Sequence, residues 1–449
     1  MSMRAAIAAT RFGLGARPGE IAAASGDPEA WLGAQLTKDS AARFPADGLS
    51  SAKDGVAFIL DFRRQIGPDR EPDQDQMAAL RRRIRQTIIG EVQARALFGA
   101  TTPNPFHERL ARFWSNHFTV SARNPPTTLI AGAYEREAIR PNILGRFEDL
   151  LLAAIGHPGM LVYLDNWQSV GPNSRAGRRR RRGLNENLAR EVLELHTATP
   201  AAGYTQYDVT EFAKALTGWT VGNRHVGRNR IGEPIFSTLL HEPGARTVLG
   251  KRYAEDGRAQ AEAILRDLAN RPETARNIAL KLARHIVSDT PDDALVANLE
   301  RVFLDTGGDL SALYRALIAS PEAWAAEAEK VKTPDELLTS ASRQFGVRRV
   351  FAGKPGEVYE SFAQRPFSAP SPEGWPDDAD AWLGPDALMK RVEWANRVAE
   401  RTSGVDARDF IDDALGPRAG ASTLQAVSRA ESGEQALAIA LMSPDFQRR

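Results

Sequence analysis

Cysteine is missing from this 449-residue sequence. Its absence excludes disulfide bonds, thiolate zinc sites, iron–sulfur clusters held by cysteine and cysteine nucleophiles, although it does not decide the cellular compartment. Seven histidines are present. Histidine together with carboxylates is therefore the ligand set that remains for zinc, iron or manganese.

An excess of charge of either sign is also missing. The 58 Lys and Arg residues are matched by 57 Asp and Glu residues, so the formal net charge is +1. No overall field draws such a protein to nucleic acid or to an anionic membrane, and any binding of that kind must be local.

Long apolar runs are absent as well. No window approaches the roughly 18 consecutive apolar residues of a membrane span. Near the start of the chain, Arg4 and Arg11 bracket only a short alanine-rich run, which lacks the apolar core of a secretory signal. The sequence therefore predicts a soluble, cytoplasmic protein.

Helical periodicity dominates what is present. Thr333-Pro334-Asp335-Glu336 combines an N-cap threonine, a proline at the first helical position and a reciprocal glutamate. The 42% hydrophobic content supports a large core, and no internal repeat indicates a solenoid. We predict an all-α fold, an irregular multi-helix bundle forming a single large domain over 1–449. A small β-hairpin or irregular excursion is expected around 219–254.

The most unusual segment is 184–197, which carries carboxylates, amides, an arginine and a histidine on one expected helix. Its leucines and valine recur at spacings of four, four and three and form a stripe that packs on a core. The polar side is then held at a partly buried edge, where pKa values shift. We predict acid–base or metal chemistry from four of its side chains: Glu186, Glu191, Glu194 and His196.

An ordinary structural interpretation of the same helix is equally open. Arg190 stands four residues from both Glu186 and Glu194, so an ion-pair network alone accounts for the pattern. A ferritin-like di-iron site is disfavoured because Glu194 and His196 are two residues apart rather than three. A zincin motif is absent.

Four histidines stand at expected element ends or turns rather than in the middle of a helix face. We predict that they are candidate ligands for a divalent transition metal: His117, His157, His196 and His241. For His117, which follows the aromatic residues Phe113 and Trp114, a satisfied position in the core is the competing interpretation.

Amides, aromatic rings and one arginine complete the predicted site. Aromatic side chains suit the rim of a sugar or peptide cleft because they combine an apolar face with a polar edge. Seven residues are predicted to bind substrate: Asn116, Asn185, Asn187, Arg190, Tyr204, Trp219 and Trp375. Trp375 belongs to the segment 352–385, rich in Pro, Gly, Asp and Trp, which is predicted to be a long loop that acts as a lid.

A basic run from Arg178 to Arg182 lies within 170–183, directly before the polar helix. We predict a flexible basic loop, with binding of a polyanion as the alternative. No signature of a nucleic-acid-binding fold accompanies the run, so nucleic acid is not expected as a partner. Its position beside a helix N-terminus would still concentrate an anionic ligand there.

Several blocks of the chain carry a family resemblance. They are Arg11-Phe12-Gly13, 113–118, 157–165, 184–197, 203–219 and Gly374-Trp375-Pro376. Together these blocks resemble the bacterial family catalogued as domain of unknown function 1800, over most of the chain. The resemblance implies no settled reaction. Many members look exported, whereas no signal is evident here, and relatives usually carry Asp at the position of Glu242.

Two functional hypotheses follow. In the first, Glu186, Glu191, His196, His117 and His241 converge in a cleft roofed by the 352–385 loop. The reaction is then acid–base or metal-assisted hydrolysis or cleavage of a polar polymer, a glycan or a peptide. In the second, the polar residues form a buried structural network, and the protein is a binding or scaffold protein whose arginine run docks an acidic partner. The oligomeric state is left open.

Overall fold

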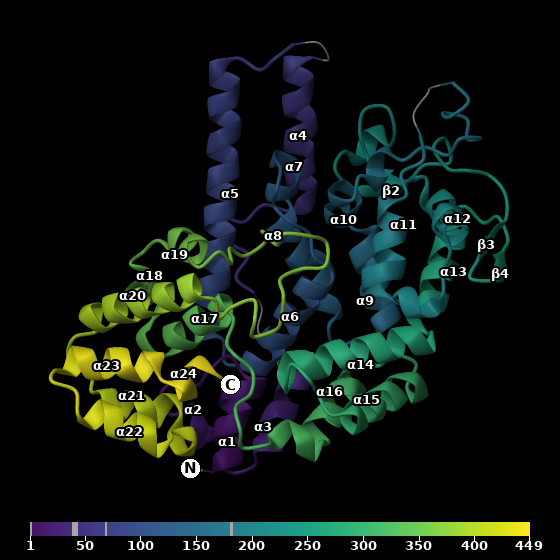
Figure 1. The fold of residues 1–449 in the computed structure, drawn as a ribbon. Helices are drawn as coiled ribbons and strands as arrows, with labels where there is room; N and C mark the ends of the chain where they lie inside the picture. The colour runs from purple at the N-terminus through teal and green to yellow at the C-terminus, as the bar shows by residue number, and fades with distance from the viewer. Residues whose placement is uncertain (1, 38–43, 68–69, 180–182) are drawn as a thin grey trace.

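A computed structural model describes residues 2–37, 44–67, 70–179 and 183–449. Figure 1 shows a predominantly helical chain in which the N- and C-termini lie close together. The first half contributes α1 (Met3–Ile7), α2 (Glu20–Ala23), α3 (Pro28–Gly33), α4 (Ala52–Ile66), α5 (Gln74–Thr101), α6 (Pro105–His117), α7 (Pro125–Thr128), α8 (Ala131–Tyr134), α9 (Phe147–Gly156), α10 (Pro158–Tyr163), α11 (Asn187–Glu191) and α12 (Gln206–Leu216). The all-α prediction is confirmed.

The second half of the chain is also mostly helical. Its helices are α13 (Arg258–Ala269), α14 (Pro272–Ile286), α15 (Asp293–Asp305), α16 (Leu310–Ala319), α17 (Pro334–Phe345), α18 (Val347–Phe351), α19 (Pro355–Ser361), α20 (Pro385–Arg401), α21 (Ala407–Ala414), α22 (Ala421–Ser428), α23 (Gly433–Met442) and α24 (Pro444–Gln447). At α17 the predicted capping box is present, because Thr333 and Glu336 exchange side-chain to backbone hydrogen bonds.

The only strands in the described residues lie within the excursion predicted at 219–254. β1 (Trp219–Val221) pairs with β2 (Pro234–Phe236), and β3 (Arg246–Val248) pairs with β4 (Lys251–Tyr253), both antiparallel. The region therefore forms two small hairpins. It packs on the helical body through Val221, which is fully buried.

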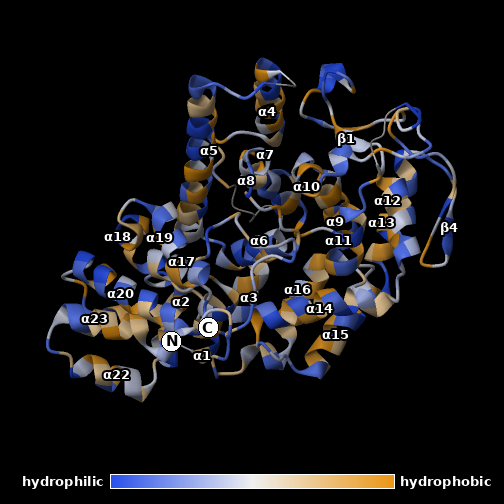
Figure 2. Ribbon diagram, turned by 45° about the horizontal axis from the view of Figure 1, so that its top comes forward, coloured by the Kyte–Doolittle hydropathy of each residue, from blue (hydrophilic) through white to orange (hydrophobic). Residues whose placement is uncertain are grey.

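Two large apolar clusters fill the interior. The first core draws on residues between Ile7 and Trp324 and includes the buried rings of α6. The second core joins α17, α20, α21 and α23 to one side of α5. Figure 2 shows that hydrophobic and hydrophilic residues alternate along these helices. Phe367 packs against both clusters, so the segment that carries it lies at their seam.

No helix among the described residues is both long enough and apolar enough to cross a membrane. The compartment in which the protein works stays a prediction.

The polar helix differs from the prediction in its length and type. It begins at Asn187 rather than at 184, because the Asn185 side chain accepts a hydrogen bond from the backbone of Asn187. After α11 the chain widens into the π-helix η6 (Val192–His196). A π-helix bonds residues five apart, so the expected row of every fourth residue breaks. Arg190 accordingly pairs with Glu186, at 3.6 Å, and no ion pair joins it to Glu194.

The 352–385 segment is also not one continuous loop. It contains α19, whose first residue, Pro355, has a backbone already suited to helix. Irregular chain follows α19 until α20 begins at Pro385. The candidate lid is thus the shorter stretch 362–384.

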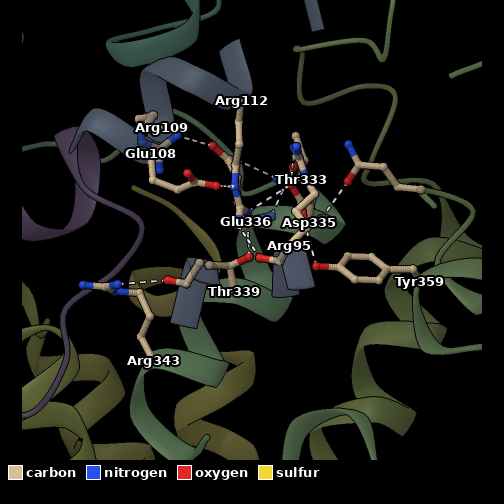
Figure 3. A network of polar contacts seen from close by, with 12 residues as sticks. Arg95, Glu108, Arg109, Arg112, Thr333, Asp335, Glu336, Thr339, Arg343 and Tyr359 are labelled. Atoms are coloured by element: carbon tan, nitrogen blue, oxygen red, sulfur yellow. Dashed lines mark hydrogen bonds and ion pairs between the residues drawn. The ribbon is translucent and has the colours of Figure 1, made fainter. Parts of the chain in front are cut away.

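Charged side chains are buried where α6 meets α17, and Figure 3 shows this network. Glu108 of α6 is completely buried and binds Arg112 at 3.0 Å and Arg140 at 2.6 Å. Arg112 also binds Asp335 of α17 at 3.1 Å, and the Tyr359 hydroxyl donates to the other oxygen of Asp335 at 2.9 Å. Each of these buried charges therefore contacts an opposite charge, as low-dielectric surroundings require.

A second set of ion pairs joins α6 and α17. Arg109 of α6 forms an ion pair with Glu336 of α17 and donates from Nε to the carbonyl of Gly13 at 2.6 Å. Arg449 binds Glu336 from the other side at 2.8 Å. Because a guanidinium can donate in several directions at once, each arginine joins elements that are remote in sequence.

We expect Glu108→Gln to lower the free energy of unfolding by about 3–5 kcal/mol, because two buried guanidinium groups lose their carboxylate. Urea unfolding measures this change. The matched control is Glu262→Gln, which removes a partly buried partner of the exposed Arg258 and should cost less than about 1 kcal/mol. A similar loss in both variants would contradict a special role for the buried network.

The pH dependence of stability should also reflect the ion pairs of Glu108. Burial opposes ionisation of Glu108, but Arg140 and Arg112 outweigh it and lower the pKa to about 2. A lowered carboxyl pKa stabilises the fold above the pKa of the unfolded chain, and this contribution is lost as the pH falls toward 2. The difference in stability between the native protein and Glu108→Gln should therefore shrink from about pH 4.5 downward, as measured by urea unfolding at a series of pH values.

Candidate functional site

The largest opening beside α6 is a cavity of about 650 Å³ between α6, α14 and the segment 370–378. This volume is in the range of small-molecule and substrate sites. α6 and α14 end at this place, so their last turns present polar side chains to it. The wall consists of Phe113, Asn116, His117, Lys281, Arg284, His285, Asp289, Pro370, Ser371, Glu373, Gly374, Trp375, Pro376, Asp377 and Asp378.

A histidine–aspartate pair forms one side of the cavity. The Nδ1 atom of His285 donates to Asp377 Oδ2 at 2.8 Å, which leaves Nε2 as the basic nitrogen. That Nε2 atom is buried and has no hydrogen-bond partner in the described residues. Burial lowers the pKa of His285 although Asp377 opposes the shift, so the ring is neutral at pH 7 and able to accept a proton.

Asp377 is itself held by a buried cation. Burial raises the pKa of its carboxyl group, but His285 and Lys330 outweigh this effect, and the pKa falls below its usual value. Lys330 is almost fully buried and also binds Asp289 at 2.5 Å. Asp377 is therefore ionised through the neutral range and fixes the proton on Nδ1 of His285.

A second neutral imidazole lines the same cavity with the opposite tautomer. The Nε2 atom of His117 donates to the backbone carbonyl of His196 at 3.2 Å, and its Nδ1 atom is buried without a partner in the described residues. Burial and the nearby Lys281 hold the pKa of His117 well below the ordinary value. Both histidines of the cavity thus offer a free basic nitrogen.

The end of the polar helix supports this wall from behind. Three successive carbonyls, those of Leu195, His196 and Thr197, accept hydrogen bonds from Lys281, His117 and Asn277. A helix end leaves such carbonyls without partners of their own. Side chains of α6 and α14 are therefore positioned by the last turn of η6.

Trp375 closes the inner side of the cavity through its backbone. The Asn116 side chain donates to the Trp375 carbonyl at 2.9 Å and accepts from the Trp375 amide at 2.8 Å. The preceding Gly374 has φ +97°, and a Cβ atom there would lie 2.6 Å from the Asn116 carbonyl oxygen. Only glycine suits this approach.

Two smaller polar chambers continue behind Trp375, of about 80 and 50 Å³. Asn116 and Trp375 line all three spaces, and His285 borders the outer two. The innermost chamber reaches Tyr134, whose buried hydroxyl has no partner among the described residues. Arg95, Arg112 and Asp335 line both smaller chambers, and all three belong to the network of Figure 3.

A family model described as a protein of unknown function, DUF1800, matches residues 7–448. The chain belongs to this family. A search of the curated proteins and a search of the solved structures found no match. The family assignment confirms the resemblance seen in the sequence. It assigns no reaction to this DUF1800 protein, because the family's function is unknown.

Three of the residues that the sequence predicted for the functional site line the cavity. They are Asn116, His117 and Trp375. His196, predicted to be catalytic, lies directly behind His117 in the first core and is completely buried. Its ring packs 5.1 Å from that of Phe118, and burial lowers its pKa to about 3. It acts on the site through its backbone carbonyl.

The predicted carboxylates of the polar helix lie elsewhere, at a partly exposed edge. Glu186 accepts hydrogen bonds from Gln206 at 2.7 Å and Thr210 at 2.6 Å. Burial and the neighbouring Glu194 raise the pKa of Glu191. Glu194 in turn interacts with Tyr204. None of these residues lines the 650 Å³ cavity.

The four predicted metal ligands are not one group. In the described part of the chain, no set of three or more His, Asp and Glu side chains is placed to hold a metal ion. His157 caps α10 and pairs with Glu137 at 3.0 Å, whereas His241 donates to the carbonyl of Thr217 at 2.9 Å. Because different elements hold these two rings, they cannot join His117 and His196.

The other predicted binding residues have structural contacts. Trp219 is 4% exposed and packs in the first core. The Asn185 side chain accepts a hydrogen bond from the backbone amide of Asn187, which is the exposed first residue of α11. Arg190 donates to Gln206 at 2.8 Å.

The predicted basic loop is described only in part. Arg178 and Arg179 are exposed, and residues 180–182 lie outside the described residues. The preceding turn is fixed rather than free, because Glu242 is buried and accepts two hydrogen bonds from Asn173, at 2.6 and 2.7 Å. The Glu242 carboxylate therefore has a structural role.

His285, Asp377 and Lys281 were not selected from the sequence. Lys281 and His285 are four residues apart on α14 and share one face of that helix, and Asp377 follows Trp375 by two residues. The helical spacing is a weak signal that many surface helices share. Only the fold brings Asp377 to His285.

We expect Gly374→Ala to lower the free energy of unfolding by about 1–3 kcal/mol, because the new methyl group requires a strained φ and collides with Asn116. Urea unfolding measures the loss. Gly384→Ala is the matched control, since this glycine has φ −58° and open space around its Cβ position. Equal stability of the Gly374 variant and the native protein would show that the Asn116 contact is not rigid.

Proposed function

We propose that this DUF1800 protein is an acid–base enzyme whose active site is the cavity between α6, α14 and 370–378. The observation that carries the proposal is the His285–Asp377 pair, because His285 lines the cavity and its buried Nε2 atom has no hydrogen-bond partner among the described residues. A carboxylate that fixes one imidazole nitrogen leaves the other as a general base near neutral pH. The base is thus placed on α14 and not on the polar helix.

The reaction class that fits is hydrolysis or cleavage of a polar polymer, a glycan or a peptide. His285 would take a proton from water or from a substrate hydroxyl, and Asp377 would stabilise the imidazolium that forms. Lys281, whose pKa burial lowers, lines the same wall and would stabilise negative charge on the substrate. The rings of Phe113 and Trp375 provide apolar surfaces for a sugar or a side chain.

His117 has a supporting place in this proposal. His117 lines the same cavity, its buried Nδ1 atom has no hydrogen-bond partner among the described residues, and its tautomer is fixed by the carbonyl of His196. Two neutral imidazoles at one site allow one to accept a proton while the other holds the substrate. The polar helix then contributes to function by positioning His117 and Lys281.

Activity should fall by about 10²- to 10⁴-fold in His285→Gln and by a comparable factor in Asp377→Asn, because each removes the oriented base. Turnover is to be followed on two panels, dye-labelled polysaccharides and unstructured polypeptides. His225→Gln is the matched control, since His225 is exposed in the excursion. Full activity of a folded His285→Gln protein would refute the proposal.

The pH profile provides an independent check. The lowered pKa of His285 keeps the base neutral until the pH drops below the ordinary histidine value of about 6.5. Activity should therefore be maintained at neutral pH and lost on the acid side of that value. In ¹⁵N NMR spectra at pH 7 the His285 ring should carry its proton on Nδ1, and a proton on Nε2 would contradict the assigned roles.

A further inference from the structure

The helices α4 and α5 form an antiparallel pair that projects from the body, as Figure 1 shows. Its inner side is apolar and includes Ile59 of α4 and Leu80 of α5, both buried. On its outer side α5 carries three exposed arginines, Arg81, Arg82 and Arg85. None of the three makes a hydrogen bond or an ion pair with any described residue.

Several other exposed helical arginines of the chain pair with a carboxylate of their own helix. Arg258 pairs with Glu262 at 2.8 Å, Arg301 with Asp305 at 3.1 Å, and Arg397 with Glu393 at 3.6 Å, each four residues apart. Around Arg82 and Arg85, in contrast, the positions three and four residues away hold only Ala, Arg, Gln and Ile. Like charges at this spacing destabilise a helix, so the fold alone does not account for them.

The arginines belong to a seam with helical spacing. Ala78, Arg82, Arg85 and Ile89 follow one another at intervals of four, three and four residues, the spacing of a helix-packing stripe. All four are exposed, and Ile89 shows 40% of its surface. The seam thus places two guanidinium groups between a small side chain, Ala78, at one end and an apolar side chain, Ile89, at the other.

The footprint favours a protein over a nucleic acid. From residue 82 to residue 85 the helix rises only about 4.5 Å, which is too short to follow a phosphate backbone. Arginine beside exposed apolar residues is typical of protein interfaces, and an apolar helix face flanked by charges docks by residues at these intervals. Carboxylates of a partner would receive the guanidinium groups in two-bond contacts.

We propose that the outer seam of α5 is a docking surface for an acidic amphipathic helix of a partner protein. The partner helix packs against the pair formed by α4 and α5 as a third helix. Its apolar side chains contact Ala78 and Ile89, and its Asp or Glu side chains bind Arg82 and Arg85. This surface is separate from the proposed active site.

The probe is a synthetic peptide of about 20 residues, long enough to form helix, with Leu and Ala on one face and Glu beside them. A second peptide has Lys in place of each Glu. Fluorescence anisotropy at low and high salt should show binding of the Glu peptide, weakened by salt. The double variant Arg82→Glu and Arg85→Glu should bind the Glu peptide at least about tenfold more weakly. The same variant should bind the Lys peptide, because the charges of the two surfaces are then opposite again.

The control is the pair Arg258→Glu and Arg266→Glu, two exposed arginines beside Glu262, which should leave peptide binding unchanged. His285→Gln should also bind normally, so loss of activity and loss of docking are distinguishable. Unchanged binding in the α5 variant overturns the proposal. So does equal loss in the control, or preferential binding of a DNA duplex or of anionic phospholipid vesicles over the Glu peptide.

Discussion

The structure depends on one constraint, which is that α6 is buried on every side although half of its residues are polar. Phe106, Leu110 and Trp114 belong to the first core. Arg109 and Arg112 form ion pairs with α17, and Glu108 binds Arg112 and Arg140. Burying an unpaired charge costs several kcal/mol, so α17 must arrive in one register to supply Asp335 and Glu336. That register in turn fixes the last turn of α6, where Asn116 and His117 meet the cavity.

The same reasoning explains why the polar helix matters without being the centre of the chemistry. Its carbonyl end, widened by the π-helix, would leave buried acceptors without partners. Lys281, His117 and Asn277 satisfy them. The concentration of charge that stands out in the sequence therefore marks a supporting element, and the reactive groups lie on the helices that bind its end.

Local signals in the sequence were sufficient for much of the fold. The capping residues before α17 predicted its start, and the β-branched runs near 219–254 predicted the hairpins. Trp375 was predicted because aromatic rings suit the rim of a cleft and because its segment was expected to be a lid, and Asn116 was predicted as one of the polar residues of the same cleft. The π-helix at 192–196 was not predictable, since its hydrogen bonds depend on tertiary partners. The contact of His285 with Asp377 spans 92 residues, a separation that no periodicity encodes.

The segment 362–384 passes where the two cores meet, and it carries strained backbone there. Phe367 packs against both clusters and has φ +60°, a conformation unfavourable for a bulky side chain. Its carbonyl accepts a hydrogen bond from Ala122 at 2.6 Å, just beyond the end of α6. Such backbone strain is maintained only when surrounding contacts impose it. The segment 362–384 therefore owes its course to contacts with both cores at once.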